Sequence, residues 1–280
     1  MLKSTLPIEH EVIGMKIVVL KVGGSILNKL PKAFYDTIVS LKESGRIHPI
    51  IVHGGGPEIN HALDQMNVKS EFVNGLRVTS SEVLNVVEQV LSGKVNKHIV
   101  TKFTQSGGIG LGLSGVDANL LKVTPQDKTG KLGFVGDVKE VNTNWLQLIA
   151  ENGGIPIISP IGIHETGQHY NINGDTAAAA VAASLGAKLV LISDIPGVLE
   201  EIQGKKVLIP KLTKAEIEEK ISSGVIYGGM IPKVYSALKA LSGGVEEAVI
   251  LNGMNPGDLK TYLSGGQVGT KIVMGEKHYV

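Results

Sequence analysis

Two apolar runs of this chain each end in a cluster of glycines. The run 17–20 leads into Lys21-Val-Gly-Gly-Ser25, and the run 49–52 leads into His53-Gly-Gly-Gly56. Apolar, β-branched runs that end in glycines are typical of buried parallel strands followed by tight turns into helices. Backbone N–H groups at such turns bind anions, and Lys21 adds a positive charge beside the first turn. The pattern therefore predicts a phosphate site and phosphoryl-transfer chemistry.

Three further segments carry polar residues at expected strand or helix ends. Asn171-Ile-Asn-Gly-Asp175 precedes an alanine-rich helix, and its two asparagines alternate as a substrate-binding pair on an extended segment would. Asp175 alone could be an ordinary helix N-cap. Ser193-Asp194 ends another apolar run, and Lys233 lies in the first turn of a helix expected to start at Pro232. A lysine at a helix N-terminus opposes the helix dipole, so a bound anion is a reasonable explanation for it.

Composition and motifs exclude several classes of function. The formal net charge of +1 gives no basis for binding nucleic acid or an anionic membrane, and the absence of cysteine excludes disulfides and thiolate catalysis. No apolar run approaches the length of a membrane span, the first 15 residues lack a signal-peptide core, and the histidines show no metal-ligand spacing. The glycines of 110–115 lie inside a strand pattern, which argues against a dinucleotide-binding turn. We expect a cytoplasmic protein with no protein-held metal, whose start is either Met1 or Met15.

The elements needed to position these residues alternate along the chain. Strands are expected at 16–22, 48–53, 109–113, 155–159, 188–193, 247–251 and 270–274, and helices at 32–44, 57–66, 81–105, 143–152, 175–185, 213–222 and 232–242. This alternation predicts an α/β fold with an open, mainly parallel central sheet between helices. Three segments, 67–80, 116–142 and 195–212, indicate β-hairpins, and we expect the first two at the sheet edge as lid-like additions.

The motifs together resemble the amino acid kinase family. The matching segments keep the family order and span roughly residues 16–274: 21–25, 53–57, 74–79, 92–97, 112–115, 170–175, 193–198 and 228–233. Asn74-Gly-Leu-Arg-Val-Thr79 and Asn171-Ile-Asn-Gly-Asp175 are specific to the branch that phosphorylates N-acetyl-L-glutamate. The resemblance therefore implies transfer of the ATP γ-phosphoryl group, with Mg²⁺, to the side-chain carboxylate of N-acetyl-L-glutamate in arginine biosynthesis.

By motif position, the resemblance also implies roles for individual residues. Lys21 and Lys233 would flank the transferring group, and Asp175 would orient both lysines. The acceptor would bind at Gly54, Gly55, Arg77, Asn171 and Asn173. The nucleotide would bind at Gly23, Gly24, Asp194, Ile195, Pro196, Gly197, Val198, Leu199, Gly228, Gly229 and Met230, with the whole stretch 225–230 lining its pocket.

We expect one domain over 1–280, with an acceptor-binding N-lobe at about 15–178 and an ATP-binding C-lobe at about 179–280 that share one sheet. Arginine-inhibited family members carry a long N-terminal helix that links dimers into a hexamer. Pro7 and Gly14 suit such a helix poorly, so we expect an arginine-insensitive homodimer. Two alternatives stay open: a kinase of the same fold for an acylated aminoadipate or another carboxylate, and a non-catalytic nucleotide or amino-acid sensor.

Overall fold

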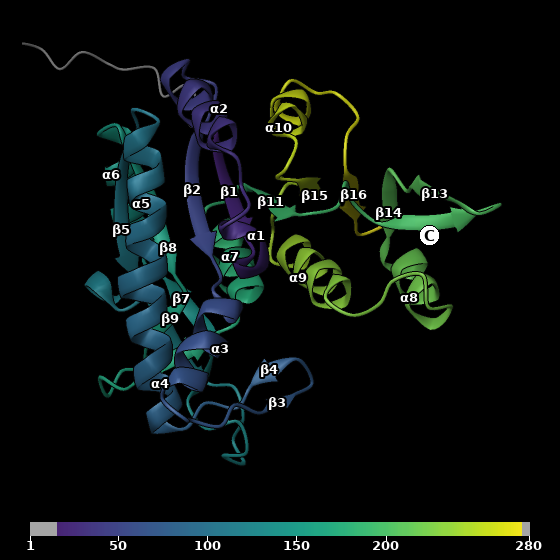
Figure 1. The fold of residues 1–280 in the computed structure, drawn as a ribbon. Coiled ribbons are helices and arrows are strands. Elements are labelled where there is room, and N and C mark those ends of the chain that lie inside the picture. Colours follow the sequence, from purple (N-terminus) through teal and green to yellow (C-terminus); the bar gives the residue numbers. More distant parts are fainter. Residues whose placement is uncertain (1–15, 276–280) are drawn as a thin grey trace, which may run out of the picture.

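An eight-stranded sheet forms the centre of the molecule (Figure 1). The computed structural model describes residues 16–275, so the segment 1–15, with Pro7, Gly14 and the alternative start Met15, lies outside the described residues. The strand order is β14 (Lys211–Thr213), β16 (Thr270–Val273), β15 (Ala248–Asn252), β11 (Lys188–Ser193), β1 (Ile17–Val22), β2 (His48–His53), β8 (Gly154–Ser159) and β5 (Ile109–Ser114). Only the pairing of β15 with β16 is antiparallel, which confirms the mainly parallel sheet.

Helices cover both faces of this sheet. Along β1, Val18, Leu20 and Val22 pack into one hydrophobic core, whereas Ile17 and Val19 pack into the other, because successive side chains of a strand point to opposite faces. The first core contains α1 (Gly24–Leu27), α2 (Lys32–Glu43), α3 (Gly56–Gln65), α4 (Ser81–Glu88), η1 (Gln89–Val95), α5 (Asn96–Gln105) and α10 (Pro256–Leu263). The second contains α6 (Thr143–Glu151), α7 (Gly174–Ser184), α8 (Lys214–Ser222) and α9 (Met230–Ser242). Two-sided burial explains the almost purely apolar sequences of the inner strands.

The helix expected at 81–105 is continuous but not uniform. Its middle part, η1, is a π-helix, and the residues at both junctions, Gln89 and Asn96, keep right-handed helical dihedral angles. Figure 1 shows the ribbon passing from α4 into α5 beside β5 and β8. π-Helical turns occur mostly as local insertions at functional sites. The apolar spacing predicted the helix and gave no sign of this insertion.

The hairpins exist, but they are separate from the central sheet. Strands β3 (Phe72–Val73) and β4 (Leu76–Arg77) are joined by Asn74 and Gly75, both with positive φ, as the Asn-Gly signal predicted. Strands β6 (Leu121–Pro125) and β7 (Val135–Val141) join β9 (Ile161–Ile163) and β10 (His169–Ile172) in a small closed sheet, and β12 (Leu199–Ile202) pairs with β13 (Lys205–Leu208). None of them pairs with a strand of the central sheet, so the expectation that the hairpins at 67–80 and 116–142 lie at the edge of that sheet was wrong.

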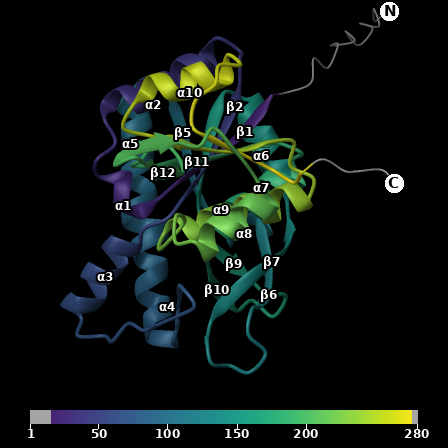
Figure 2. The same cartoon turned by 90° about the vertical axis from the view of Figure 1, so that its right-hand side faces the viewer.

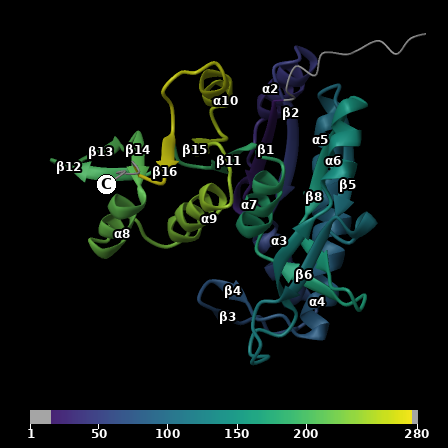
Figure 3. The same ribbon diagram turned by 180° about the vertical axis from the view of Figure 1, so that it is seen from behind.

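These small sheets surround the ends of the central strands. Figure 2 shows β6, β7, β9 and β10 in the lower half of the view together with α3 and α4, and Figure 3 shows β12, β13 and α8 on the opposite side from β6 and α4. Within residues 16–275, no helix has the length and apolar character that crossing a membrane requires.

Candidate active site

A nearly buried ion pair lies where β1 ends. Nζ of Lys21 is 2.8 Å from Oδ1 of Asp175, and both side chains are less than a tenth exposed. Lys21 is the next-to-last residue of the fully buried strand β1, and Asp175 lies in the first turn of α7. Asn173, rather than Asp175, is the N-cap of α7: its side-chain oxygen accepts hydrogen bonds from the N–H groups of Asp175 and Thr176. The carboxylate of Asp175 is therefore available to hold Lys21 at the helix N-terminus.

The two glycine turns touch each other. A Cβ atom placed on Gly24 would lie 2.7 Å from both Cα and N of Gly55, so only glycine fits at position 24. The N–H of Gly54 donates to the carbonyl of Val22, which ties the second turn to the end of β1. Among residues 16–275, the N–H of Gly55 has no backbone acceptor. The contact brings the N-terminal ends of α1 and α3, with their free N–H groups, to one place.

A cavity of about 210 Å³ opens beside these turns. Its lining contains the Lys21–Asp175 pair, Gly24 and every acceptor residue predicted from the sequence: Gly54, Gly55, Arg77, Asn171 and Asn173. Strands β4 and β10 contribute Arg77 and Asn171, residues far from the glycine turns in sequence. The structure thus brings the predicted acceptor residues together.

The buried guanidinium of Arg77 is held in one orientation. It donates to the hydroxyl of Ser70 and, at 2.5 Å, to the side-chain oxygen of Asn60, and it lies 4.7 Å from the centroid of the Phe72 ring. Burial lowers its pKa, although a guanidinium stays charged at any physiological pH. The amide nitrogen of Asn171 donates to Oγ1 of Thr79 at 3.1 Å, so its side-chain oxygen remains for a ligand. The cavity therefore offers a fixed positive charge, as a carboxylate ligand requires.

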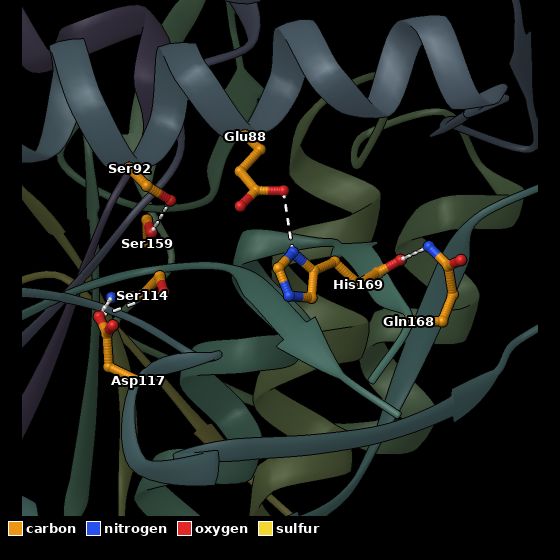
Figure 4. Close-up of polar contacts among 7 residues, drawn as sticks. All are labelled: Glu88, Ser92, Ser114, Asp117, Ser159, Gln168 and His169. Atoms are coloured by element: carbon orange, nitrogen blue, oxygen red, sulfur yellow. Dashed lines mark hydrogen bonds and ion pairs between the residues drawn. The ribbon is translucent and has the colours of Figure 1, made fainter. Parts of the chain in front are cut away.

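Two ion-pair or hydrogen-bond contacts connect the long helix to the strands of this region (Figure 4). Nδ1 of His169, on β10, lies 3.0 Å from Oε2 of Glu88, and the hydroxyls of Ser92 and Ser159 lie 2.8 Å apart. His169 is two residues before Asn171 on the same strand. The helix thereby anchors the strand that carries a predicted acceptor residue.

A second cavity of about 620 Å³ lies between the C-terminal end of β11 and the start of β12. Of the residues predicted for the nucleotide, it is lined by Asp194, Ile195, Val198, Leu199, Gly229 and Met230, and Lys233 joins them. Gly23, Pro196, Gly197 and Gly228 are outside its lining, and Gly24 lines the first cavity instead. Gly197 has a φ of +154°, and a Cβ there would lie 2.4 Å from Oγ1 of Thr270, so its glycine is required by packing.

Several residues of the second cavity had no sequence motif to reveal them. Glu200, Glu201 and Lys206 reach it from the β12–β13 hairpin. Hairpin residues of this kind have no positional signature before the fold is known. Ser25 of the motif 21–25 and exposed Tyr227 of the predicted stretch 225–230 also line it. The cavity therefore joins elements from both ends of the chain.

The two lysines lie close enough to repel each other. Burial lowers the pKa of half-buried Lys233, and the charge of Lys21 lowers it further, while Asp175 and Asp194 oppose this effect. Nζ of Lys233 donates to the carbonyl of Gly229 at 3.2 Å within α9. Lys21 lines the first cavity and Lys233 the second. An anion placed between the cavities would relieve the repulsion between the two ammonium groups.

Comparisons with known proteins agree with this arrangement. Residues 16–252 match the model of the amino acid kinase family. An acetylglutamate kinase from Oceanobacillus iheyensis is 56% identical over 95% of this chain and 100% of its own length. One from Geobacillus thermodenitrificans is 49% identical over 91% of this chain and 95% of its length. The crystal structure of smu.665 from Streptococcus mutans is 33% identical with a TM-score of 0.80, covering 93% of this chain and 99% of that one. The chain belongs to the amino acid kinase family.

Proposed function

We propose that this protein transfers the γ-phosphoryl group of ATP to the side-chain carboxylate of N-acetyl-L-glutamate, as an enzyme of arginine biosynthesis. The observation that carries the proposal is the placement of Lys21 and Lys233, one in each of two cavities and near enough to interact. Similarity to acetylglutamate kinases along nearly the whole chain supports the choice of acceptor.

The reaction needs charge stabilisation more than proton transfer. The side-chain carboxylate of the acceptor is already ionised near neutral pH, so no general base is required. One of its oxygens bonds to the γ-phosphorus as the bond from that phosphorus to the β–γ bridging oxygen breaks, and ADP leaves with the electron pair. Lys21 and Lys233 stabilise the charge on the phosphoryl oxygens, and the free N–H groups at the glycine turns add fixed donors. Asp175 holds Lys21 in place.

The acceptor is oriented by the cavity of about 210 Å³. Arg77 binds its α-carboxylate, because the guanidinium is buried and already fixed by Ser70 and Asn60. Asn171 adds a hydrogen bond from β10. Asn173 contributes chiefly by capping α7, since its side-chain oxygen is occupied by two N–H groups.

The residues fit a magnesium ion carried by the nucleotide. Among the residues described, 16–275, no three His, Asp or Glu side chains come together as a metal cage. Mg²⁺ commonly keeps water and phosphate ligands and takes only one or two carboxylates, for which Asp194 is available in the second cavity. When bound, the ion neutralises charge on the β- and γ-phosphate oxygens.

The two cavities lie in different parts of the chain, which correspond to the two expected lobes. The first cavity is lined only by residues between 21 and 175, and the second by residues between 193 and 233 together with Ser25. We therefore assign acceptor binding to an N-lobe at about 15–178 and ATP binding to a C-lobe at about 179–280. The parallel pairing of β1 with β11 joins the two lobes in one sheet.

We also propose a cytoplasmic homodimer formed through β5. This strand is at the edge of the central sheet, and Ile109 and Leu111 on it are 68% and 45% exposed. An exposed apolar edge strand pairs readily with another chain. Light scattering should give a dimer for the wild type and a monomer for Leu111→Lys, with Met66→Lys, an exposed apolar residue after α3, as the control. A dimer in both variants, or a monomeric wild type, would contradict dimerisation through β5.

An acceptor panel tests the activity. ADP release should be fast with N-acetyl-L-glutamate and weak with acylated aminoadipate, glutamate, carbamate and UMP. Hydroxylamine should trap the acyl phosphate as a hydroxamate. Greater activity on the aminoadipate derivative would identify that derivative as the acceptor. Binding of ATP without ADP release in the presence of any acceptor would indicate a sensor.

A further inference from the structure

A fully buried histidine lies directly behind the second glycine turn. His53 ends β2, and its Nδ1 lies 3.0 Å from the carbonyl oxygen of Gly54. Its Nε2 lies 3.2 Å from Nδ2 of Asn96, the first residue of α5, which is also fully buried. Neither residue has a part in the chemistry described above, and the motifs that contain them, 53–57 and 92–97, predicted no role for either side chain.

The neighbours of Asn96 determine which nitrogen of His53 carries the proton. Nδ2 of Asn96 lies 2.9 Å from the carbonyl oxygen of Ile157 and 3.2 Å from that of Leu113, so this atom must be the amide donor. Its Oδ1 accepts from Nζ of Lys97. Nε2 of His53 therefore faces a donor and must accept, which leaves the proton on Nδ1. Burial lowers the pKa of His53 to about 4, so the ring is neutral at physiological pH.

We propose that His53, oriented by Asn96, is a positioning residue that aims the N–H of Gly55 at the transferring phosphoryl group. The carbonyl of Gly54 and the N–H of Gly55 belong to the same peptide unit, and in a trans peptide these groups point in opposite directions. The Nδ1–H of His53 holds the carbonyl, so the N–H is fixed on the opposite side. Glycine turns are otherwise free to rotate their peptides. The inference rests on the proposed phosphoryl transfer.

The surroundings are built to hold this pair. A Cβ atom on Gly112 would lie 1.9 Å from Oδ1 of Asn96, so glycine at this position leaves the space that Asn96 occupies. Leu91, on η1, covers Gly55: a Cβ atom placed on Gly55 would lie 2.5 Å from Cδ2 of Leu91. These contacts give a structural role to Gly112 of the 110–115 pattern.

Two substitutions of His53 separate positioning from packing. The amide nitrogen of His53→Asn lies at the distance of Nδ1 from the backbone and can still donate to Gly54. The amide of His53→Gln lies at the distance of Nε2 and cannot. We expect His53→Gln to lower kcat about 100-fold, the effect of losing one oriented donor, and His53→Asn to recover most of it. The KM for ATP and the melting temperature should be similar in the two variants. Equal kcat values in the two variants would overturn the proposal.

A second pair of variants avoids substituting His53. Gly112→Ala should displace Asn96 and lower kcat. Gly110→Ala on the same strand serves as the matched control, because its Cβ would come closest, at 2.9 Å, to the end of the Ile157 side chain and would not approach Asn96. Equal activity of these two variants would contradict the role of Asn96.

A spectroscopic measurement tests the inference apart from the activity. Nitrogen NMR of the wild-type protein with labelled histidine should show the Nδ1–H tautomer of His53 near pH 7, with His53→Asn identifying the signal. The Nε2–H tautomer or a protonated ring would overturn the inference even in a fully active enzyme. Absence of wild-type activity on every acceptor, with the Nδ1–H tautomer present, would instead contradict the proposed function.

Discussion

Burial of His53 makes the stability of the fold depend on pH in a specific window. The pKa of its ring falls from 6.5 in the unfolded chain to about 4 in the folded protein, chiefly because burial disfavours the charged form, with a smaller effect of Lys97. Above about pH 6.5 the ring is neutral in both states. Between pH 6.5 and 4 the unfolded chain takes up a proton that the folded protein does not, so the free energy of unfolding decreases as the pH falls.

The size of this effect follows from the shift. One pKa unit corresponds to about 1.4 kcal/mol, so a shift of about 2.5 units lowers the free energy of unfolding by about 3 kcal/mol from pH 7 to pH 4. At pH 5 about 2 kcal/mol of that loss should already be present. This is a substantial part of the 5–15 kcal/mol that typically stabilises a folded domain.

Urea unfolding followed by circular dichroism can measure the effect. Wild type and His53→Asn should be compared at several pH values and one protein concentration, so that association contributes equally. The difference between their unfolding free energies isolates His53, because the other titrating groups are common to both. This difference should change by about 2 kcal/mol between pH 7 and pH 5, with the wild type losing more. A difference that stays constant with pH would refute the reasoning, since it would mean that the folded protein protonates His53 as easily as the unfolded chain.

Three further outcomes follow from the site. Lys21→Ala and Lys233→Ala should each lower kcat by about 100- to 1,000-fold with a smaller change in KM, and near-normal kcat in either variant would contradict the assigned roles. Arg77→Ala should raise the KM for N-acetyl-L-glutamate by about 10- to 100-fold, because it removes a charge-assisted hydrogen bond. A change confined to the KM for ATP would contradict the assignment of Arg77 to the acceptor. Gly24→Ala should lower kcat at least about 100-fold, since its Cβ would meet the backbone of Gly55, and an active variant would show that the turns can separate at little cost.

The strands and helices of the central sheet could be predicted because their signals are local. β2 begins and ends at the predicted residues, and α3 starts one residue before Pro57, where a missing N–H costs little. The short strands β9 and β10 were missed. They have three and four residues, which is too short to show a periodicity. They pair with each other locally, but their other partners, β6 and β7, are distant in sequence.

The residues of the candidate site were likewise predictable only where a sequence motif contained a signal for their role. Lys21, Arg77 and Asn171 occupy recognisable motifs, and the structure gathers them around one cavity. His53 and Asn96 lie in the motifs 53–57 and 92–97, but no role was predicted for their side chains, because the interaction between them joins residues 43 positions apart. A histidine that ends an otherwise apolar, buried strand was the available signal. The nucleotide roles of Gly23, Pro196, Gly197 and Gly228 stay predictions, because these residues lie outside the lining of the second cavity.

The π-helical stretch η1 has a consequence for helical register. Leu91, within it, covers Gly55, and Asn96, immediately after it, reaches His53. Each residue of an α-helix advances about 100° around the axis, and the i→i+5 bonds of η1 place about one more residue in its turn. Winding the same residues 89–95 as an α-helix would therefore rotate α5 by about that angle relative to α4. Asn96 would then point away from the turn while Glu88 still faced His169. The phase between the two halves of one helix thus determines whether the acceptor strand and the glycine turn are supported at the same time.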